Sequence, residues 1–341
     1  MKTRKLFLVF LAIAGILTGC SRDEAVEQIN NGSEISFRLQ GGTPSNVLRA
    51  TATTNETIDA FVVWGTDNVF GATNELIFSG VTIARKVGGT PGSPTFEYAP
   101  KRYFGEGATN AGFFAISPAS AKITPPVLLN FMTAGASFGY TVPAPNASGN
   151  TIQEDLLVAT TGPIAPASPV SLDFYHALSR IFVTATNNAA DPVIIHSLTL
   201  KNLYNTGTLN VSPAGTWGWT PTGTKVDYDY VLAETGVVVP PDGTIITPRL
   251  VTSMEQGMLI LPQITANPSD DNVFDTGDFA LEVVYTFANL VNQPKFILIE
   301  DGFPFLFNTQ YKININFSVG AVIDFTIDVK PFVDGIDPEV Y

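Results

Sequence analysis

Apolar and polar residues alternate strictly near the start of the chain, over residues 34–40. Ile35, Phe37 and Leu39 would point to one face and the polar residues between them to the other, which predicts a half-buried strand. A Gly-Gly-Thr-Pro sequence follows at 41–44 and ends any regular element. The chain beyond it is polar and rich in threonine, so its backbone could be exposed.

Short runs of Val, Ile, Thr and Phe recur between turn-forming residues and predict further strands. Long amphipathic helical patterns are scarce, and a parallel sheet would need helical crossovers that this pattern lacks. We therefore expect an all-β fold built from β-sandwich units. The expected strands are 58–64, 76–84, 112–117, 155–160, 194–203, 226–232, 257–262, 279–287, 311–319 and 322–333.

The length of 341 residues is sufficient for two domains of ordinary size. We expect an N-terminal β-sandwich over 34–162 and a C-terminal one over 170–341. The stretch 163–169 holds three prolines and would form a stiff linker between them.

Composition narrows the classes of function. Apolar residues make up 45% of the chain and charged residues 14%, so there is enough material for a core and disorder is not expected. The formal net charge of -13 argues against nucleic acid as a partner, because phosphate contacts need Lys and Arg.

The first 20 residues have the features of an export signal. A basic start precedes an apolar run over 6–17 that is too short to span a bilayer comfortably. The signal ends Leu-Thr-Gly-Cys at 17–20, which looks like the lipobox of bacterial lipoproteins, so Cys20, the only cysteine, would carry the lipid anchor. The alternative is an ordinary cleaved signal with an incidental cysteine. Residues 21–33 would form a flexible tether.

Catalysis is not expected, and neither is a cofactor or a metal. The two histidines, His176 and His196, lie in apolar runs and are interpreted as structural, and no serine sits in a Gly-x-Ser-x-Gly turn. The acidic stretch 270–278 departs from calcium-loop spacing, because Val273 occupies a ligand position. Trp217 and Trp219 are candidate sugar-binding residues, although turns also carry such side chains.

Several landmarks in order along the chain resemble the fimbrillins, the lipoprotein pilins of type V fimbriae. After the lipobox come Phe-Tyr-His-Ala-Leu-Ser-Arg-Ile at 174–181 and Gly-Met-Leu-Ile-Leu-Pro-Gln at 257–263. Asn-Thr-Gln-Tyr-Lys-Ile-Asn-Ile at 308–315 then precedes an alternating final strand. The resemblance covers most of the chain.

The resemblance implies two tandem transthyretin-like β-sandwich domains and export as a surface-exposed outer-membrane lipoprotein. It also implies cleavage by an Arg-specific protease, followed by strand exchange between fimbrial subunits. The family's cleavage site would fall at Arg49-Ala50. Arg22 and Arg38 are alternatives, but cleavage at Arg22 leaves the first strand attached and cleavage at Arg38 divides it. Arg49 could also be an uncleaved loop residue.

The donor strand in this scheme would come from the C-terminal segment 322–333. Ile323, Phe325, Ile327 and Val329 alternate with polar residues, as in a strand with one face for pockets. The alternative is a plain closing strand of the second sandwich.

The function expected from these features is that of a structural fimbrial subunit that serves surface adhesion. A removable strand and a donor strand on one chain favour a stalk subunit over a tip or anchor subunit. The alternative is a surface lipoprotein that does not polymerise and binds a host glycan or host protein. A hydrolase is a distant third reading.

Overall fold

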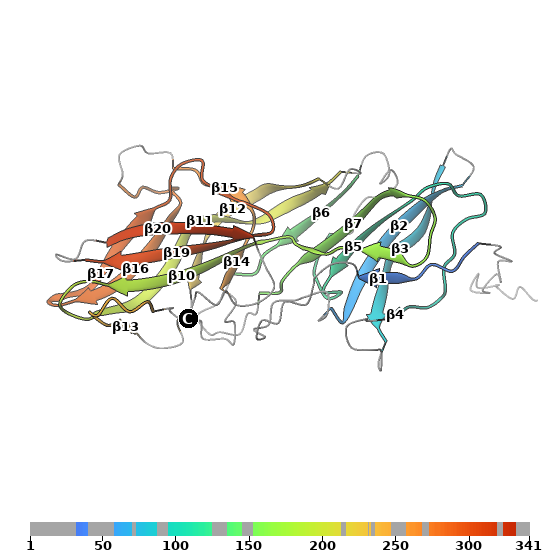
Figure 1. Cartoon of the computed structure of the whole chain (residues 1–341). Coiled ribbons are helices and arrows are strands. Elements are labelled where there is room, and N and C mark those ends of the chain that lie inside the picture. The colour runs from blue at the N-terminus through green and yellow to red at the C-terminus, as the bar shows by residue number, and fades with distance from the viewer. Residues whose placement is uncertain are drawn as a thin grey trace, which may run out of the picture.

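The computed structural model describes residues 32–39, 58–69, 73–86, 95–124, 135–144, 153–212, 216–230, 232, 236–246, 257–267, 273–318 and 323–331. All of the regular secondary structure assigned to these residues is β-strand, which confirms the expected all-β class. Within these ranges there is no helix of the length and apolarity needed to cross a membrane. The molecule is elongated, with the early strands toward one end and the late strands toward the other (Figure 1).

The N-terminal half is built on one six-stranded sheet. A short two-stranded parallel sheet, β1 (Phe37–Leu39) with β8 (Val170–Leu172), packs its apolar side chains into the same core cluster as one face of the large sheet. The large sheet has the order β4-β3-β2-β5-β7-β9. Its strands are β2 (Ala60–Val69), β3 (Thr73–Arg85), β4 (Phe96–Glu97), β5 (Ala111–Ser117), β7 (Leu157–Ile164) and β9 (Tyr175–His176).

Both faces of this sheet are buried at its centre, around β5, because side chains there alternate between two cores. On β5, Phe113 points into the core shared with β1, whereas Phe114 points into the larger core shared with the C-terminal half. All seven residues of β5 are buried as a result.

The C-terminal half contains two main sheets and one short antiparallel pair of strands. The first sheet has the order β14-β10-β19-β20, in which β10 and β19 run parallel. The second has the order β12-β11-β16-β17, and β15 pairs with β18. The strands are β10 (Ser179–Asn187), β11 (Val193–Val211), β12 (Trp217–Tyr230), β13 (Val237–Val239), β14 (Met258–Ile260), β15 (Gln263–Ile264), β16 (Ala280–Phe287), β17 (Leu290–Leu298), β18 (Pro304–Phe305), β19 (Thr309–Phe317) and β20 (Ile323–Pro331).

The outer strand β17 has the features of a protected sheet edge. It pairs with β16 and, within the described residues, with no second strand. Its first six residues are exposed and include Pro294, which has no N–H to offer, and Lys295.

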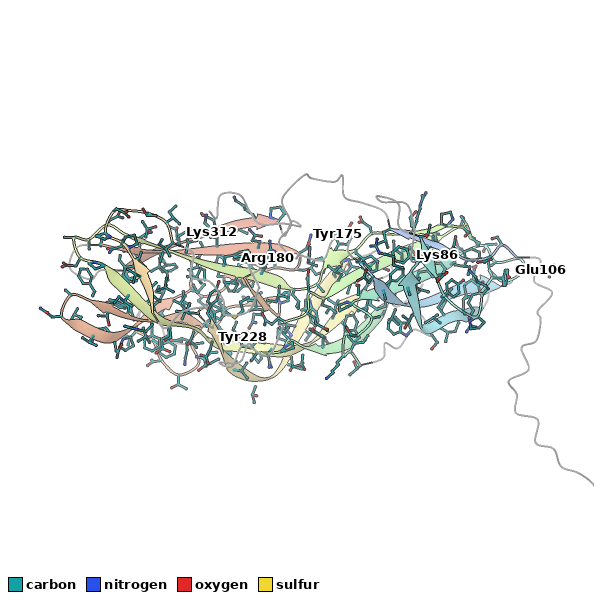
Figure 2. The ribbon with its side chains drawn as sticks, turned by 90° about the horizontal axis from the view of Figure 1, so that it is seen from below. Lys86, Glu106, Tyr175, Arg180, Tyr228 and Lys312 are labelled. Carbon is teal, nitrogen blue, oxygen red and sulfur yellow. The ribbon has the colours of Figure 1, made fainter. Side chains whose placement is uncertain are left out.

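The two halves are joined by strands that cross the expected division. β6 (Ala136–Thr141) lies within the expected N-terminal range, yet it pairs with residues 206–211 of β11. β8 and β9 follow the proline-rich stretch, yet they pair with β1 and β7. The chain therefore leaves the first sheet after His176, and Tyr175 lies near the middle of the long axis (Figure 2).

Candidate functional site

The segment around β1 fills the core of the N-terminal half. Ile35 is 0% exposed and Phe37 is 5% exposed, while Leu39 is half-buried against the same cluster. The ring of Phe37 meets four other rings at centroid distances of 5.4–6.2 Å, mostly edge to face. These rings belong to Phe61, Phe78, Tyr98 and Phe113.

Hydrogen bonds to its backbone hold the segment along both of its edges. On one edge, the Ile35 N–H donates to the Arg102 carbonyl at 2.9 Å, and the Tyr98 hydroxyl donates to the Ile35 carbonyl at 2.6 Å. On the other edge, the Val170 N–H donates to the Ser36 carbonyl at 2.8 Å. Burial raises the pKa of Tyr98, so its hydroxyl remains a donor at neutral pH.

The polar face of the segment points toward solvent. The Arg38 Nε–H donates to Ser171 Oγ at 2.6 Å, and the hydroxyls of Ser36 and Ser168 lie 2.8 Å apart. Glu34 pairs with Lys101 across 2.6 Å in an exposed position, where an ion pair contributes little. β1 therefore covers its groove from the outside, with its apolar side chains inward and its polar ones outward.

Sequence reasoning did not identify the groove that receives β1. One wall is the segment 98–104, a polar run in which only the aromatic residues hint at burial. The other wall is 168–172, which lies partly in the stretch expected to be a linker. Cys20, Arg49 and Ala50 lie outside the described residues.

The C-terminal strand β20 closes the sheet of the second half as an edge strand. It pairs with all nine residues of β19, with Phe325 opposite Ile315 and Ile327 opposite Ile313. Ile323, Phe325 and Ile327 are half-buried against the large core, and Val329 is 53% exposed. Within the described residues β20 pairs with β19 alone.

The two candidate sugar-binding residues pack between the halves of the molecule. Trp217 stacks on Phe307 with ring centroids 5.8 Å apart and also approaches Phe114. The Trp219 Nε1–H donates to the Ala177 carbonyl at 2.7 Å. These contacts support a packing role for both rings.

Both histidines have hydrogen-bond partners, in the interior for His176 and at a half-buried position for His196. His176 Nδ1 lies 3.0 Å from Asp155 Oδ1, and both side chains are buried. His196 Nε2 lies 2.7 Å from Thr286 Oγ1. Three or more His, Cys, Asp or Glu residues do not gather at any metal-binding distance in the part of the chain that the structure describes.

Comparison with known proteins finds one family and a set of similar folds. A family model described as fimbrillin-like matches residues 49–331. No curated protein matches the chain. A fimbrial protein from Bacteroides vulgatus has a TM-score of 0.57 at 13% identity, covering 88% of this chain and 99% of its own. Because the identity is this low, the likeness shows a shared fold.

Two further solved structures match more distantly. A fimbrial assembly protein from Parabacteroides distasonis has a TM-score of 0.42 at 11% identity, covering 88% of this chain and 98% of its own. The tip fimbrial protein Mfa3 from Porphyromonas gingivalis, with a C-terminal truncation, has a TM-score of 0.42 at 8% identity. That match covers 80% of this chain and 94% of its own.

Proposed function

Because the chain belongs to the fimbrillin-like family, we propose that it is a structural subunit of type V fimbriae that serves surface adhesion. Family membership points to a structural role without catalysis and to other fimbrial subunits as partners. In the proposal, Cys20 carries the lipid that anchors the exported protein in the outer membrane. An Arg-specific protease then cuts after Arg49, and subunits polymerise by donor-strand exchange.

The observation that carries the proposal is the placement of β1. The segment lies at the surface of its half, yet Ile35 and Phe37 are buried in that core. The family match begins at residue 49 and therefore leaves this segment out. A cut at Arg49 would leave 34–39 held only by noncovalent contacts.

The magnitudes favour replacement of the strand over an empty groove. Full burial of Ile35 and Phe37 contributes about 1.5–3 kcal/mol each, and half-buried Leu39 contributes less, so the strand supplies an amount comparable with the lower end of a domain's net stability, about 5–15 kcal/mol. Loss of the strand would also leave the Arg102 carbonyl, the Tyr98 hydroxyl and the Val170 N–H without their present partners. A cut subunit is therefore driven to accept another strand.

Limited proteolysis tests the proposal directly. Protein beginning at Ser21 is treated with trypsin at low dose, and the products are separated in detergent without boiling. We expect an early cut after Arg49 and a ladder of oligomers that survives the detergent. Arg49→Ala should abolish the ladder, and Arg22→Ala, a matched change outside the strand, should leave it intact.

Two results would contradict the proposal. A cut product that stays monomeric at every dose favours a surface lipoprotein that does not polymerise. A ladder that persists in Arg49→Ala places the maturation site elsewhere.

A further inference from the structure

The first and last strands carry the same pattern of side chains in the same order. Residues 35–39 read Ile-Ser-Phe-Arg-Leu, and residues 323–327 read Ile-Asp-Phe-Thr-Ile. Resting on the proposed function, we propose that β20 of a second copy enters the groove of β1 in one register and one direction. Phe325 takes the place of Phe37, and the strand runs parallel to β8, as β1 does.

The positions of Ile35, Phe37 and Leu39 in the groove are called its three slots, and the aromatic slot of Phe37 sets this register. Phe37 is surrounded by four rings, and a phenyl group from the donor would restore all four contacts. The flanking positions, Ile35 and Leu39, would receive Ile323 and Ile327, which have the same or nearly the same volume.

Registers shifted by two residues fit worse in either direction. In one, Ala321 enters the fully closed site of Ile35 and leaves a cavity, while Ile323 lies among the rings. In the other, Phe325 is forced into the site of Ile35, which is 0% exposed and too small for a phenyl ring. A shift by one residue would turn the acidic face of the donor toward the core.

The polar face of the donor also suits the rim of the groove. Asp324 would take the position of Ser36, where the Ser168 hydroxyl can donate to its carboxylate. Thr326 would take the position of Arg38 and lie beside Ser171. With Glu34 gone, Lys101 at the rim would face a donor strand that carries acidic residues.

The backbone of the donor can remake the hydrogen bonds of β1. The bonds at residues 35 and 36 use main-chain N–H and C=O groups, which do not depend on side-chain identity. Residues 323–327 contain no proline, and the first proline of the donor is Pro331, four residues beyond the last slot.

Transfer completes the burial of the donor side chains. Where β20 pairs with β19, the ring of Phe325 is half-buried, whereas the ring of Phe37 in the groove is 5% exposed.

β1 and β20 lie toward opposite ends of the molecule (Figure 1), so the donor has to come from a second copy. β20 is an edge strand and can leave without separating any other pair of strands.

Cysteine cross-linking in the polymer tests the register. Ser171 is the partner of Arg38 across the groove, so the double variant Ser171→Cys with Thr326→Cys should form intermolecular disulfides after low-dose trypsin and mild oxidation. The controls pair Ser171→Cys with Asp324→Cys or with Asp328→Cys. A shift of two residues moves the Cα by about 7 Å, beyond the range for a disulfide. Protein beginning at Ser21 contains no other cysteine.

The outcomes separate this inference from the function on which it rests. Cross-linked dimers at least about tenfold more abundant with Thr326→Cys than with either control support the register, because only that pair lies within disulfide range. Polymers that cross-link through a control pair overturn the register but leave β20 as the donor strand. Polymers that cross-link through none of the three pairs overturn the register and require a different donor strand. Failure of the unsubstituted protein to polymerise overturns both.

A peptide measurement gives an independent reading that does not depend on folding of a variant. A fluorescent peptide with the sequence of residues 322–330 is added to trypsin-cut subunits, and its binding is followed by anisotropy. Replacing Phe325 by Ala in the peptide should weaken binding at least about 100-fold, since the loss of a buried phenyl ring is large. Replacing Val329 by Ala, beyond the three slots, should change binding little. Equal loss in both peptides would contradict the register.

Discussion

At the scale of single residues, Phe37 connects several elements of the N-terminal core. Its four aromatic neighbours come from β2, β3, β5 and the segment before Lys101, so one ring connects elements that are far apart in the sequence. Its neighbour Arg38 points to solvent and makes one side-chain hydrogen bond to Ser171. Adjacent residues of one short strand therefore have very different energetic weight.

Replacing Phe37 by Ala should destabilise the uncut protein by about 3–5 kcal/mol, because it removes a buried ring and leaves a cavity among other rings. Replacing Arg38 by Ala should cost less than about 1 kcal/mol, because the contact that it loses is exposed. Urea unfolding followed by tryptophan fluorescence measures both. Equal effects of the two changes would mean that β1 does not form part of the folded core.

Buried tyrosines predict a loss of stability in alkali. Burial, with smaller contributions from Glu154 and Asp155, raises the pKa of Tyr140 from 10.0 to about 12. A phenol with a higher pKa in the folded state holds its proton more tightly there. Its contribution to stability is therefore complete below pH 10.0 and is lost as the pH rises toward about 12.

The free energy of unfolding should accordingly be flat from neutral pH to about pH 9.5 and fall above it, near the ordinary tyrosine pKa. Tyr140→Phe has no phenol to ionise and should reduce the slope of this fall, and its own stability at neutral pH serves as the reference. Urea titrations across the range measure the slope. An unchanged slope in Tyr140→Phe would show that this residue does not titrate as its burial requires.

At the scale of elements, the hairpin of β11 and β12 connects the two halves. The first part of β11 pairs with β13 and β16, and its last six residues pair with β6. The far end of the hairpin places Trp217 against Phe114 of the first sheet. The hairpin therefore packs against both halves of the molecule.

Replacing Trp217 by Ala should lower the free energy of unfolding, because it removes the stacking on Phe307 and the contact with Phe114. We expect a loss of about 2–3 kcal/mol, less than for a fully buried ring because Trp217 is half-buried. Thr222→Ala, an exposed change on the same strand, should be nearly neutral. Differential scanning calorimetry measures both changes, and equal effects would contradict the role of Trp217 in packing the two halves together.

The strands were predictable where runs of Val, Ile, Thr and Phe lie between turn-forming residues, and the prediction failed where two backbones approach closely. The expected strands 58–64, 112–117 and 311–319 overlap β2, β5 and β19. The expected strand 194–203 ends eight residues before β11 does, and the part that was missed contains Gly207, a residue type common in turns. A Cβ at Gly207 would lie 2.8 Å from Leu261 Cδ2 and 3.0 Å from the Thr220 carbonyl, so glycine is needed there inside a strand.

At the scale of the whole molecule, the larger core extends across both halves. It contains Phe114 and Val158 of the first sheet together with Tyr228 and Ile313 of the other two sheets. The division at 163–169 expected from proline content could not reveal this, because local composition carries no information about which distant strands pair. The same limit applied to the groove of β1, whose two walls are about 70 residues apart in the sequence.

Separate halves should therefore not fold on their own. Fragments 21–177 and 178–341, each expressed alone, should lack a cooperative unfolding transition, because β6 loses β11 and the Phe114 face of β5 becomes exposed. Co-expression should recover a complex with the transition of the intact chain. Circular dichroism with thermal scans measures this, and an independently folded fragment would contradict the shared core.

Under the proposed polymerisation, the exposed strand β17 affects how neighbouring filaments would interact. The strand carries two exposed residues that hinder pairing: Pro294, which lacks a hydrogen-bond donor, and Lys295, which is positively charged. It is the last strand of its sheet among the described residues. Sideways fusion of neighbouring filaments through this edge would leave ladder positions unpaired. Growth would then be confined to the length of the fibre, which would yield separate threads in place of ribbons or bundles.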